Sequence, residues 1–313
     1  MASATTPSPE IAASVTPEPG EGPQSIATLR DQQEVDGVFA CAQKERQISR
    51  AGAAYLTLTL SDATGTIRAR VFRDADVLAG RFERGDLVHV RGRAQRFREE
   101  LQISVEQIAR AEGEQADPAR FLPTAYRDRD ELEGFLEHLA REVHDPGLNA
   151  LLQNLLEDDG LRAQWRRAPC TRNGHHAYLG GLLEHTVAVA TLAYELCTLH
   201  QRLDRDLLLC AAIVHDIGKT REFSYGAEIS RSAEGSMLGH VELGLRIIAA
   251  HVPPTLAAER RLALEHCVLL HHGAEAAGGA RFVSPEALAL FRLNALDAQV
   301  KGAFEQGLAA PAR

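Results

Sequence analysis

Long apolar runs are missing from this sequence of 313 residues. No window approaches about eighteen consecutive apolar residues, so we expect no membrane-spanning helix and no membrane partner. The first basic residue is Arg30, and the segment before it is rich in Ser, Thr, Pro and Glu without an apolar stretch, which excludes a secretory signal. We therefore expect a cytoplasmic protein.

Cysteine pairs are also missing. The five cysteines are an odd number, and no two of them form a C-x-x-C pair. This pattern argues against a disulfide framework and against a zinc ribbon. Cys197, Cys210 and Cys267 lie in apolar helical runs, where cysteine is most often a small core residue.

An excess of positive charge is absent as well. The formal net charge is −9, which at first disfavours a nucleic-acid partner. Residues 24–113 are about neutral, however, and most of the acidic excess lies in residues 114–313. An acidic body still accepts phosphate ligands where the site holds metal cations, because those ions are then the largest local charges.

Alternation with a period of two residues runs from about residue 35 to residue 110. Residues 55–60 and 66–72 alternate on either side of a turn, and residues 87–91 and 101–105 give further strands. Short alternating strands separated by Gly and Asp predict a small all-β barrel or sandwich, which we place at residues 24–113. Residues 1–23 are predicted to be a disordered tail.

Beyond Asp117 the period becomes helical. Asp145-Pro-Gly147 breaks the pattern between the first two amphipathic segments. The sequence therefore predicts a multidomain β + α protein, with a linker at 114–130 and an all-α domain at 131–308. The predicted helices cover residues 131–143, 148–156, 181–199, 205–215, 238–250, 257–271 and 285–304.

Histidine is abundant in the helical part, where ten of the 13 histidines lie between His175 and His272. The clearest feature is His215-Asp216, which ends an apolar run and is costly to bury unless something compensates it. Neutral imidazole and ionised carboxylate together suit Mn, Fe, Zn or Ni ions. Gly218 then lets the backbone turn sharply, and Lys219 follows close enough to meet a phosphate oxygen.

Other histidines and aspartates fall on helices that face a common core. Each alone has a simpler explanation, such as a hydrogen-bonded core histidine or a helix cap, and only their conjunction favours a metal site. Their number exceeds the three or four protein ligands of one catalytic ion and suits two adjacent ions. The candidate metal ligands are His185, His215, Asp216, His240, His271, His272 and Asp297.

Arginines in the β region point to a second kind of site. A groove that combines guanidinium groups with an exposed aromatic ring is typical of binding to single-stranded nucleic acid. The alternative is a solvated charged face, which the neighbouring Glu99-Glu100 favours somewhat. The candidate nucleic-acid-binding residues are Arg68, Arg70, Arg91, Arg93, Arg96, Phe97 and Arg98.

The order His185, His215-Asp216 and Asp297 resembles the signature of the HD-domain phosphohydrolases. The fuller motifs are similar to those of the YhaM-type 3′-to-5′ exoribonucleases, which carry an OB-fold before the HD domain. One departure is Arg292-Leu-Asn294, where the family more often has a polar stretch. The motifs are His175-His-Ala-Tyr-Leu-Gly-Gly-Leu-Leu-Glu-His-Thr186, His215-Asp-Ile-Gly-Lys219, Leu238-Gly-His240, His271-His-Gly273, Ser284-Pro-Glu-Ala287 and Leu296-Asp-Ala298.

This resemblance implies an OB-fold followed by an HD-domain helical bundle, and the same metal ligands as above. It implies hydrolysis of single-stranded RNA, with single-stranded DNA as a further candidate substrate, to mononucleotides from the 3′ end. Asp216 would bridge two divalent ions and Lys219 would stabilise charge on the phosphate oxygens. We expect Mn²⁺ first, with Co²⁺, Fe²⁺, Ni²⁺ or Mg²⁺ as alternatives.

Two other functions stay open at this point. The same metal chemistry serves a phosphohydrolase acting on free nucleotides or cyclic dinucleotides, in which the β domain is regulatory. A catalytically silent nucleic-acid-binding protein is the third hypothesis, against which the intact His215-Asp216 pair argues. The sequence leaves a homo-oligomer open.

Overall fold

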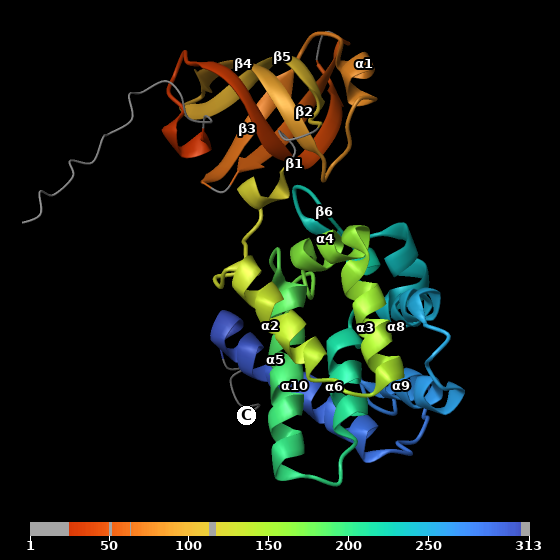
Figure 1. The fold of residues 1–313 in the computed structure, drawn as a ribbon. Coiled ribbons are helices and arrows are strands. Elements are labelled where there is room, and N and C mark those ends of the chain that lie inside the picture. Colours follow the sequence, from red (N-terminus) through yellow and green to blue (C-terminus); the bar gives the residue numbers. More distant parts are fainter. Residues whose placement is uncertain (1–24, 50–51, 63, 113–116, 308–313) are drawn as a thin grey trace, which may run out of the picture.

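The chain forms an N-terminal β-barrel and a larger helical domain. The computed structural model describes residues 25–49, 52–62, 64–112 and 117–307, and the predicted tail at 1–23 lies outside them. The two domains stack end to end and meet at a narrow waist (Figure 1). The expected fold class, a small barrel followed by an all-α domain, is confirmed.

Five strands close the barrel in the order β1-β2-β3-β5-β4. Only the β3–β5 pair is parallel, and the other neighbours are antiparallel. A 3₁₀ turn, η1 (Ile26–Thr28), precedes the barrel, and α1 (Ala75–Ala79) lies between its third and fourth strands. The strands are β1 (Glu34–Ile48), β2 (Ala54–Asp62), β3 (Gly65–Val71), β4 (Leu87–Phe97) and β5 (Glu100–Arg110).

The alternation in the sequence determines which side chains fill the barrel. Leu56, Leu58 and Leu60 of β2 are fully buried, together with Phe39 and Ile103. The residues between them point outward, because successive side chains of a strand lie on opposite faces. The structure extends β4 and β5 beyond their predicted ends, and β1 is a strand that the sequence did not separate from its surroundings.

Seven long or medium helices of the second domain agree closely with their predicted ranges. α4 and the short elements around α7 were not predicted. The elements are α2 (Arg129–Arg141), α3 (Pro146–Glu157), α4 (Asp159–Arg167), α5 (Gly181–Leu199), α6 (Arg205–Val214), α7 (Lys219–Glu222), β6 (Phe223–Tyr225), β7 (Ile229–Arg231), α8 (Ala233–His251), α9 (Ala258–Leu270) and α10 (Pro285–Gln306).

Helix starts follow local capping chemistry. The Asp145 carboxylate accepts hydrogen bonds from the backbone N–H groups of Gly147 and Leu148, both at 3.0 Å, and Pro146 occupies the first helical position of α3. Asp128, Asp158 and Asp204 cap α2, α4 and α6 in the same way. These caps fix the register in which each helix presents its apolar side to the core.

α5 is the central helix of this domain. It is the one described helix that is long and apolar enough to span a membrane by length and composition. Half of that apolar window is buried inside the domain, where α5 packs against α2, α6 and α10. We therefore identify α5 as a core helix.

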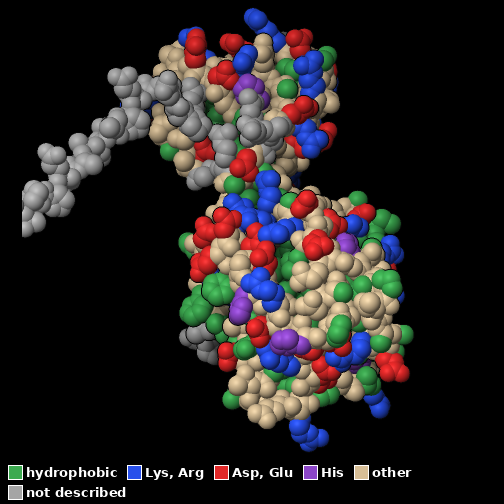
Figure 2. All heavy atoms as spheres, in the orientation of Figure 1, with side chains coloured by type: hydrophobic (Ala, Val, Ile, Leu, Met, Phe, Trp, Pro, Cys, Tyr) green, Lys and Arg blue, Asp and Glu red, His purple; other side chains and the backbone are tan. Residues whose placement is uncertain are grey.

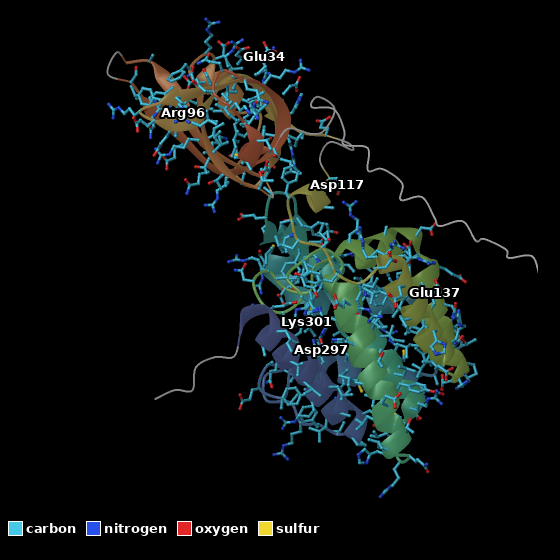
Figure 3. All side chains as sticks on the ribbon, turned by 90° about the vertical axis from the view of Figure 1, so that its left-hand side faces the viewer. Glu34, Arg96, Asp117, Glu137, Asp297 and Lys301 are labelled. Carbon is cyan, nitrogen blue, oxygen red and sulfur yellow. The ribbon has the colours of Figure 1, made fainter. Side chains whose placement is uncertain are left out.

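The two domains touch through a small apolar cluster and a hairpin. The cluster consists of Val38, Ala40, Leu87 and Ala111 with Phe121 and Ala227. At the tip of the β6–β7 hairpin, the Ala227 N–H donates to the Gly85 carbonyl at 3.3 Å. Asp117 lies at the junction of the two domains (Figure 3).

The predicted linker contributes to the helical domain. The Ala125 N–H donates to the Leu179 carbonyl and the Leu179 N–H donates to the Pro123 carbonyl, both at 2.9 Å. Residues 123–125 therefore brace the loop before α5.

Gly92 tests the packing of the barrel. A Cβ atom at this position, next to a bulge in β4, would lie 2.2 Å from the Ser104 carbonyl oxygen of β5. We expect Gly92→Ala to destabilise the protein by about 1–3 kcal/mol, because backbone must move to admit the methyl group. The measurement is a thermal unfolding scan.

Gly134→Ala is the matched control. Gly134 lies on the exposed side of α2 with no atom near its Cβ position, so alanine should stabilise by about 0.5–1 kcal/mol through helix propensity. Equal unfolding temperatures for Gly92→Ala and the wild type would contradict the close approach of Gly92 to the backbone of β5.

Candidate metal centre

The predicted ligands converge from five helices on one region around the buried Asp216. His185 lies in the first turn of α5, and Asp297 comes from α10. His215 and Asp216 follow the C-terminal end of α6, and His271 and His272 follow the end of α9. His185, His215 and His271 are fully buried and Asp216 is 1% exposed.

Backbone carbonyls orient two of the imidazoles. His215 Nδ1 donates to the Ala212 carbonyl at 2.8 Å, and His271 Nδ1 donates to the Val268 carbonyl at 2.6 Å. Because a carbonyl oxygen can only accept, the proton of each neutral ring sits on Nδ1. Each Nε2 therefore presents a lone pair to the centre, as metal ligation requires.

His240 reaches the centre through a break in α8. Gly239 has φ of +71°, outside the helical region, so His240 begins a second helical segment. Gly218 allows this segment to approach, since a Cβ there would lie 1.9 Å from the His240 carbonyl oxygen. Glycine is therefore needed at position 218 because the two segments pack closely there. The sharp turn that we expected is not the reason, since the φ of Gly218 is −64°, which any residue adopts.

Asp216 lies at the centre of the site. Its Oδ2 accepts from Lys219 Nζ at 2.6 Å and lies 3.4 Å from His215 Nε2. Its Oδ1 lies 3.4 Å from His240 Nε2 and 3.3 Å from His271 Nε2. The two carboxylate oxygens therefore face different groups of histidines.

The Oδ1 environment fits a cation. This buried oxygen has no hydrogen-bond partner among the described residues, although it faces the unprotonated Nε2 of His271. Two lone pairs pointed at each other in a buried site are unfavourable unless a positive charge lies between them. Asp216, His240, His271 and His272 bring ligand atoms within 4.8 Å of one another, which suits a divalent metal ion.

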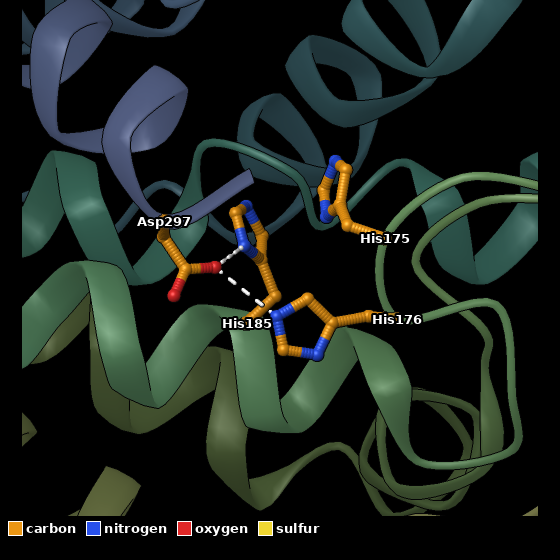
Figure 4. A group of neighbouring side chains, drawn as sticks. All are labelled: His175, His176, His185 and Asp297. Carbon is orange, nitrogen blue, oxygen red and sulfur yellow. Dashed lines mark hydrogen bonds and ion pairs between the residues drawn. The ribbon is translucent and has the colours of Figure 1, made fainter. Parts of the chain in front are cut away.

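A second group of ligand atoms lies on the other side of Asp216. His175, His176, His185 and Asp297 also bring ligand atoms within 4.8 Å of one another (Figure 4). His185 Nδ1 donates to Asp297 Oδ2 at 2.6 Å, which leaves its Nε2 as a ligand atom 3.2 Å from His215 Nε2. The structure thus brings all seven predicted metal ligands into one region.

The protonation states of His215 and Asp216 suit metal ligation. Burial lowers the pKa of His215 to about 4, so the imidazole is neutral near pH 7. Burial alone would raise the pKa of Asp216, but the charge of Lys219 outweighs it and holds that pKa well below the usual aspartate value. Neutral imidazoles beside an ionised carboxylate are the donor set that divalent transition metals prefer.

Lys219 is deeper than the sequence suggested. The side chain is buried, and its ammonium group contacts Asp216 and lies 3.4 Å from the Cys170 thiol. A contact between Lys219 and a phosphate oxygen stays a prediction, and the lysine is placed to balance the charge of Asp216.

His176 is a residue of the site that sequence reasoning missed. Its Nε2 donates to Asp297 Oδ2 at 3.1 Å, and its Nδ1 lies 2.9 Å from the Tyr178 hydroxyl (Figure 4). His176 has φ of +52°, and a Cβ on Gly181 would lie 2.2 Å from its carbonyl oxygen. The backbone at His176 is therefore held in a strained conformation, which keeps the imidazole in contact with Asp297.

The only signal for His176 in the sequence was its place in the motif that begins at His175. The Tyr178 hydroxyl in turn donates to Glu184, which pairs with Lys301 of α10. Figure 3 shows Lys301 one turn beyond Asp297 on that helix. Polar contacts therefore continue from the Asp297 carboxylate to the protein surface.

Two more polar residues contact predicted ligands. Asn294 Oδ1 lies 3.0 Å from His185 Nε2 and its Nδ2 donates to the His271 carbonyl at 3.2 Å, within the stretch where the sequence departs from the family pattern. The buried Glu222 carboxylate lies 3.3 Å from His240 Nδ1. A carboxylate beside Nδ1 fixes the rotation of the His240 ring and the nitrogen that carries its proton.

On the barrel, the predicted nucleic-acid-binding residues divide into two sets. The Arg70 and Arg98 guanidinium groups lie 4.9 and 5.5 Å from the centre of the Phe97 ring, which is 45% exposed. The other set is engaged: Arg68 pairs with Glu100, Arg91 with Asp36 and Arg93 with Glu34, and Arg96 donates to the Glu99 carbonyl. Arg96 and Glu34 lie on the outside of the barrel (Figure 3).

Asp216→Asn tests the centre. We expect the variant to lose measurable Mn²⁺ binding, because the amide removes the negative charge that faces both histidine groups. Isothermal titration of the metal-stripped protein measures it, with His138→Gln, on the exposed side of α2, as the control. Wild-type affinity in Asp216→Asn would contradict the assignment.

His176→Asn tests the support of Asp297. Asparagine tolerates a positive φ, so the change removes the ring without adding backbone strain. We expect Mn²⁺ affinity to fall by about 10–100-fold, the usual effect of losing a group that orients a ligand, at an unchanged unfolding temperature of the metal-free protein. An unchanged affinity would show that Asp297 needs no such support.

Two known protein families match this chain. The HD domain family matches residues 182–299, and the family described as OB-fold nucleic acid binding domain matches residues 42–110. Among solved structures, the second OB-fold domain of replication protein A from Methanococcus maripaludis is 22% identical and covers 29% of this chain and 97% of that one, with a TM-score of 0.25.

Curated relatives match across both domains. The chain is 29% identical to the 3′-5′ exoribonuclease YhaM of Shouchella clausii over 85% of this chain and 84% of that protein. It is 28% identical to YhaM of Bacillus velezensis over 77% of each chain. The chain thus joins an OB-fold to an HD domain, and its resemblance to the YhaM-type exoribonucleases is confirmed.

Proposed function

We propose that this protein is a metal-dependent 3′-5′ exoribonuclease that hydrolyses single-stranded RNA to mononucleotides. The observation that carries the proposal is the position of Asp216, whose two oxygens face two separate histidine groups. This arrangement supports two ions that share one carboxylate, and a two-ion centre suits phosphodiester hydrolysis. RNA as substrate and the 3′-to-5′ direction rest on the relatives named YhaM.

The chain's own residues would hold and orient the reacting groups. His240, His271 and His272 would hold one ion with Asp216, and His185, His215 and Asp297 would hold the other with it. Bound divalent ions would supply Lewis acidity and a water of lowered pKa. Lys219 keeps Asp216 ionised. Glu222 orients the His240 ring, and His176 orients the Asp297 carboxylate. We propose Mn²⁺ as the preferred ion.

The barrel would bind the strand. Arg70 and Arg98 beside the exposed Phe97 offer a surface on which a base can stack near two positive charges. Single-stranded DNA is a second candidate ligand, because stacking and phosphate contacts do not read the 2′-hydroxyl. The apolar α5 lies inside the helical core, which supports a soluble enzyme, and we propose the cytoplasm as its compartment.

Incubation of the metal-stripped protein with 5′-labelled single-stranded RNA tests the proposal. With Mn²⁺ we expect a ladder of products that shorten from the 3′ end, and no products without metal. Asp216→Asn should lower the rate by at least about 10³-fold, because a shared carboxylate organises both ions. Products are separated on a denaturing gel.

His138→Gln is the control and should give the wild-type ladder. RNA that stays intact with every divalent ion tested would overturn the exoribonuclease proposal. Free nucleotides and cyclic dinucleotides would then be the substrates to test on the same centre.

A further inference from the structure

Two hollows lie along the seam between the barrel and the helical domain. The first, of about 310 Å³, is lined on the barrel side by Gln43, Thr59 and Ser61. The second, of about 390 Å³, is lined on the helical side by Arg172, Asn173 and Ala177. Arg84, Ala227 and Glu228 line both hollows, so the two share a wall and together run from one domain to the other.

The second hollow borders a loop that also carries residues of the metal site. Arg172, Asn173 and Ala177 belong to the loop that also carries His175 and His176. The His175 ring lies 5.2 Å from the His185 ring, and His176 contacts Asp297. One stretch of loop therefore has residues on the second hollow and residues on the metal site.

Two arginines in the seam stand out by their lack of partners. Arg110 pairs with Asp86 and Arg167 pairs with Asp117. Arg84 and Arg172 are exposed, and neither forms an ion pair with any residue that the structure describes. With Glu228, the seam carries two positive charges against one negative charge, on a chain whose net charge is −9. Figure 2 shows basic side chains gathered at the waist between the domains, beside acidic ones.

Tight turns hold both arginines in place. Around Arg84, the Glu83 N–H donates to Asp86 Oδ2 at 2.7 Å and the Gly85 N–H donates to the Cys41 carbonyl at 2.9 Å. Around Arg172, the Gly174 N–H donates to Thr171 Oγ1 at 2.9 Å, and that hydroxyl donates to the His175 carbonyl at 2.8 Å. Fixed backbones of this kind lower the entropy cost of binding a ligand.

We infer that Arg84 and Arg172 bind successive phosphates of a single RNA strand on its way from the barrel to the metal centre. Guanidinium groups suit phosphate oxygens, and unpaired ones need no existing contact to be broken. Thr59 and Ser61 offer hydroxyls to sugars and bases at the barrel end of the same path. The inference rests on the proposed function for the identity of the strand and adds the route that it takes.

The test compares Arg84→Ala/Arg172→Ala with the wild type in two measurements. The first is binding of a labelled single-stranded RNA of about 20 nucleotides to the metal-stripped full-length protein, followed by fluorescence anisotropy over a range of salt concentrations. We expect the Kd to rise about tenfold and the slope of log K against log salt to become shallower by roughly 1.4, for two lost phosphate contacts on a single strand. Arg84→Lys/Arg172→Lys should restore the slope, because lysine keeps the charge.

The second measurement is metal-dependent turnover of the same RNA and of a dinucleotide. The double alanine variant should raise KM for the long RNA about tenfold and leave the dinucleotide unaffected, because the dinucleotide is too short to span the seam. Arg202→Ala is the control, since Arg202 is an exposed arginine in the loop that joins the C-terminal end of α5 to α6, whereas the seam borders the loop before the N-terminal end of α5.

A Kd and salt slope equal to those of the wild type, or an equal loss in Arg202→Ala, would overturn the inference. So would a parallel loss on the dinucleotide, which would place Arg172 at the metal centre. If the wild type cleaves no RNA with any metal, the proposed function fails, while the binding measurement on metal-stripped protein still decides whether the seam holds the strand.

Discussion

A buried carboxylate surrounded by imidazole nitrogens governs the architecture of the helical domain. Asp216 is 1% exposed, and only one of its oxygens has a cationic partner, Lys219. An ionised group in such a place is tolerated only where positive charge converges on it. Helices α5, α8 and α9 each bring a histidine nitrogen within 3.5 Å of Asp216, and α10 brings Asp297 against His185, so their packing around α6 assembles the donor set that a divalent cation prefers.

Much of the fold and the ligand set could be predicted because both leave local traces in the sequence. Leu56, Leu58 and Leu60 show the alternation of a half-buried strand directly. The polar pair His215-Asp216 stands out because it follows the uninterrupted apolar run at residues 207–214. The predicted bounds of α5 agree with the structure, since Gly180 ends the preceding loop in a left-handed conformation.

The parts that could not be predicted depend on contacts between distant segments. Asn294 and Glu222 touch metal ligands that lie far from them in sequence, and nothing in their own surroundings marks them. The position of His176 depends on a positive φ, which no neighbouring residue in the sequence predicts. The arginines of β4 illustrate the reverse: Arg91 and Arg93 suggest a binding groove, but β1 supplies Asp36 and Glu34 opposite them.

The β6–β7 hairpin begins directly after Glu222, the residue that contacts the His240 ring, and its tip touches the barrel. The Glu222 backbone is clamped: its carbonyl accepts from the Ser232 N–H at 2.9 Å, and Gly235 packs against it so closely that a Cβ would lie 2.2 Å away. The backbone that positions the Glu222 carboxylate against His240 is therefore fixed by contacts within the helical domain, and the contact with the barrel lies beyond it, at Ala227.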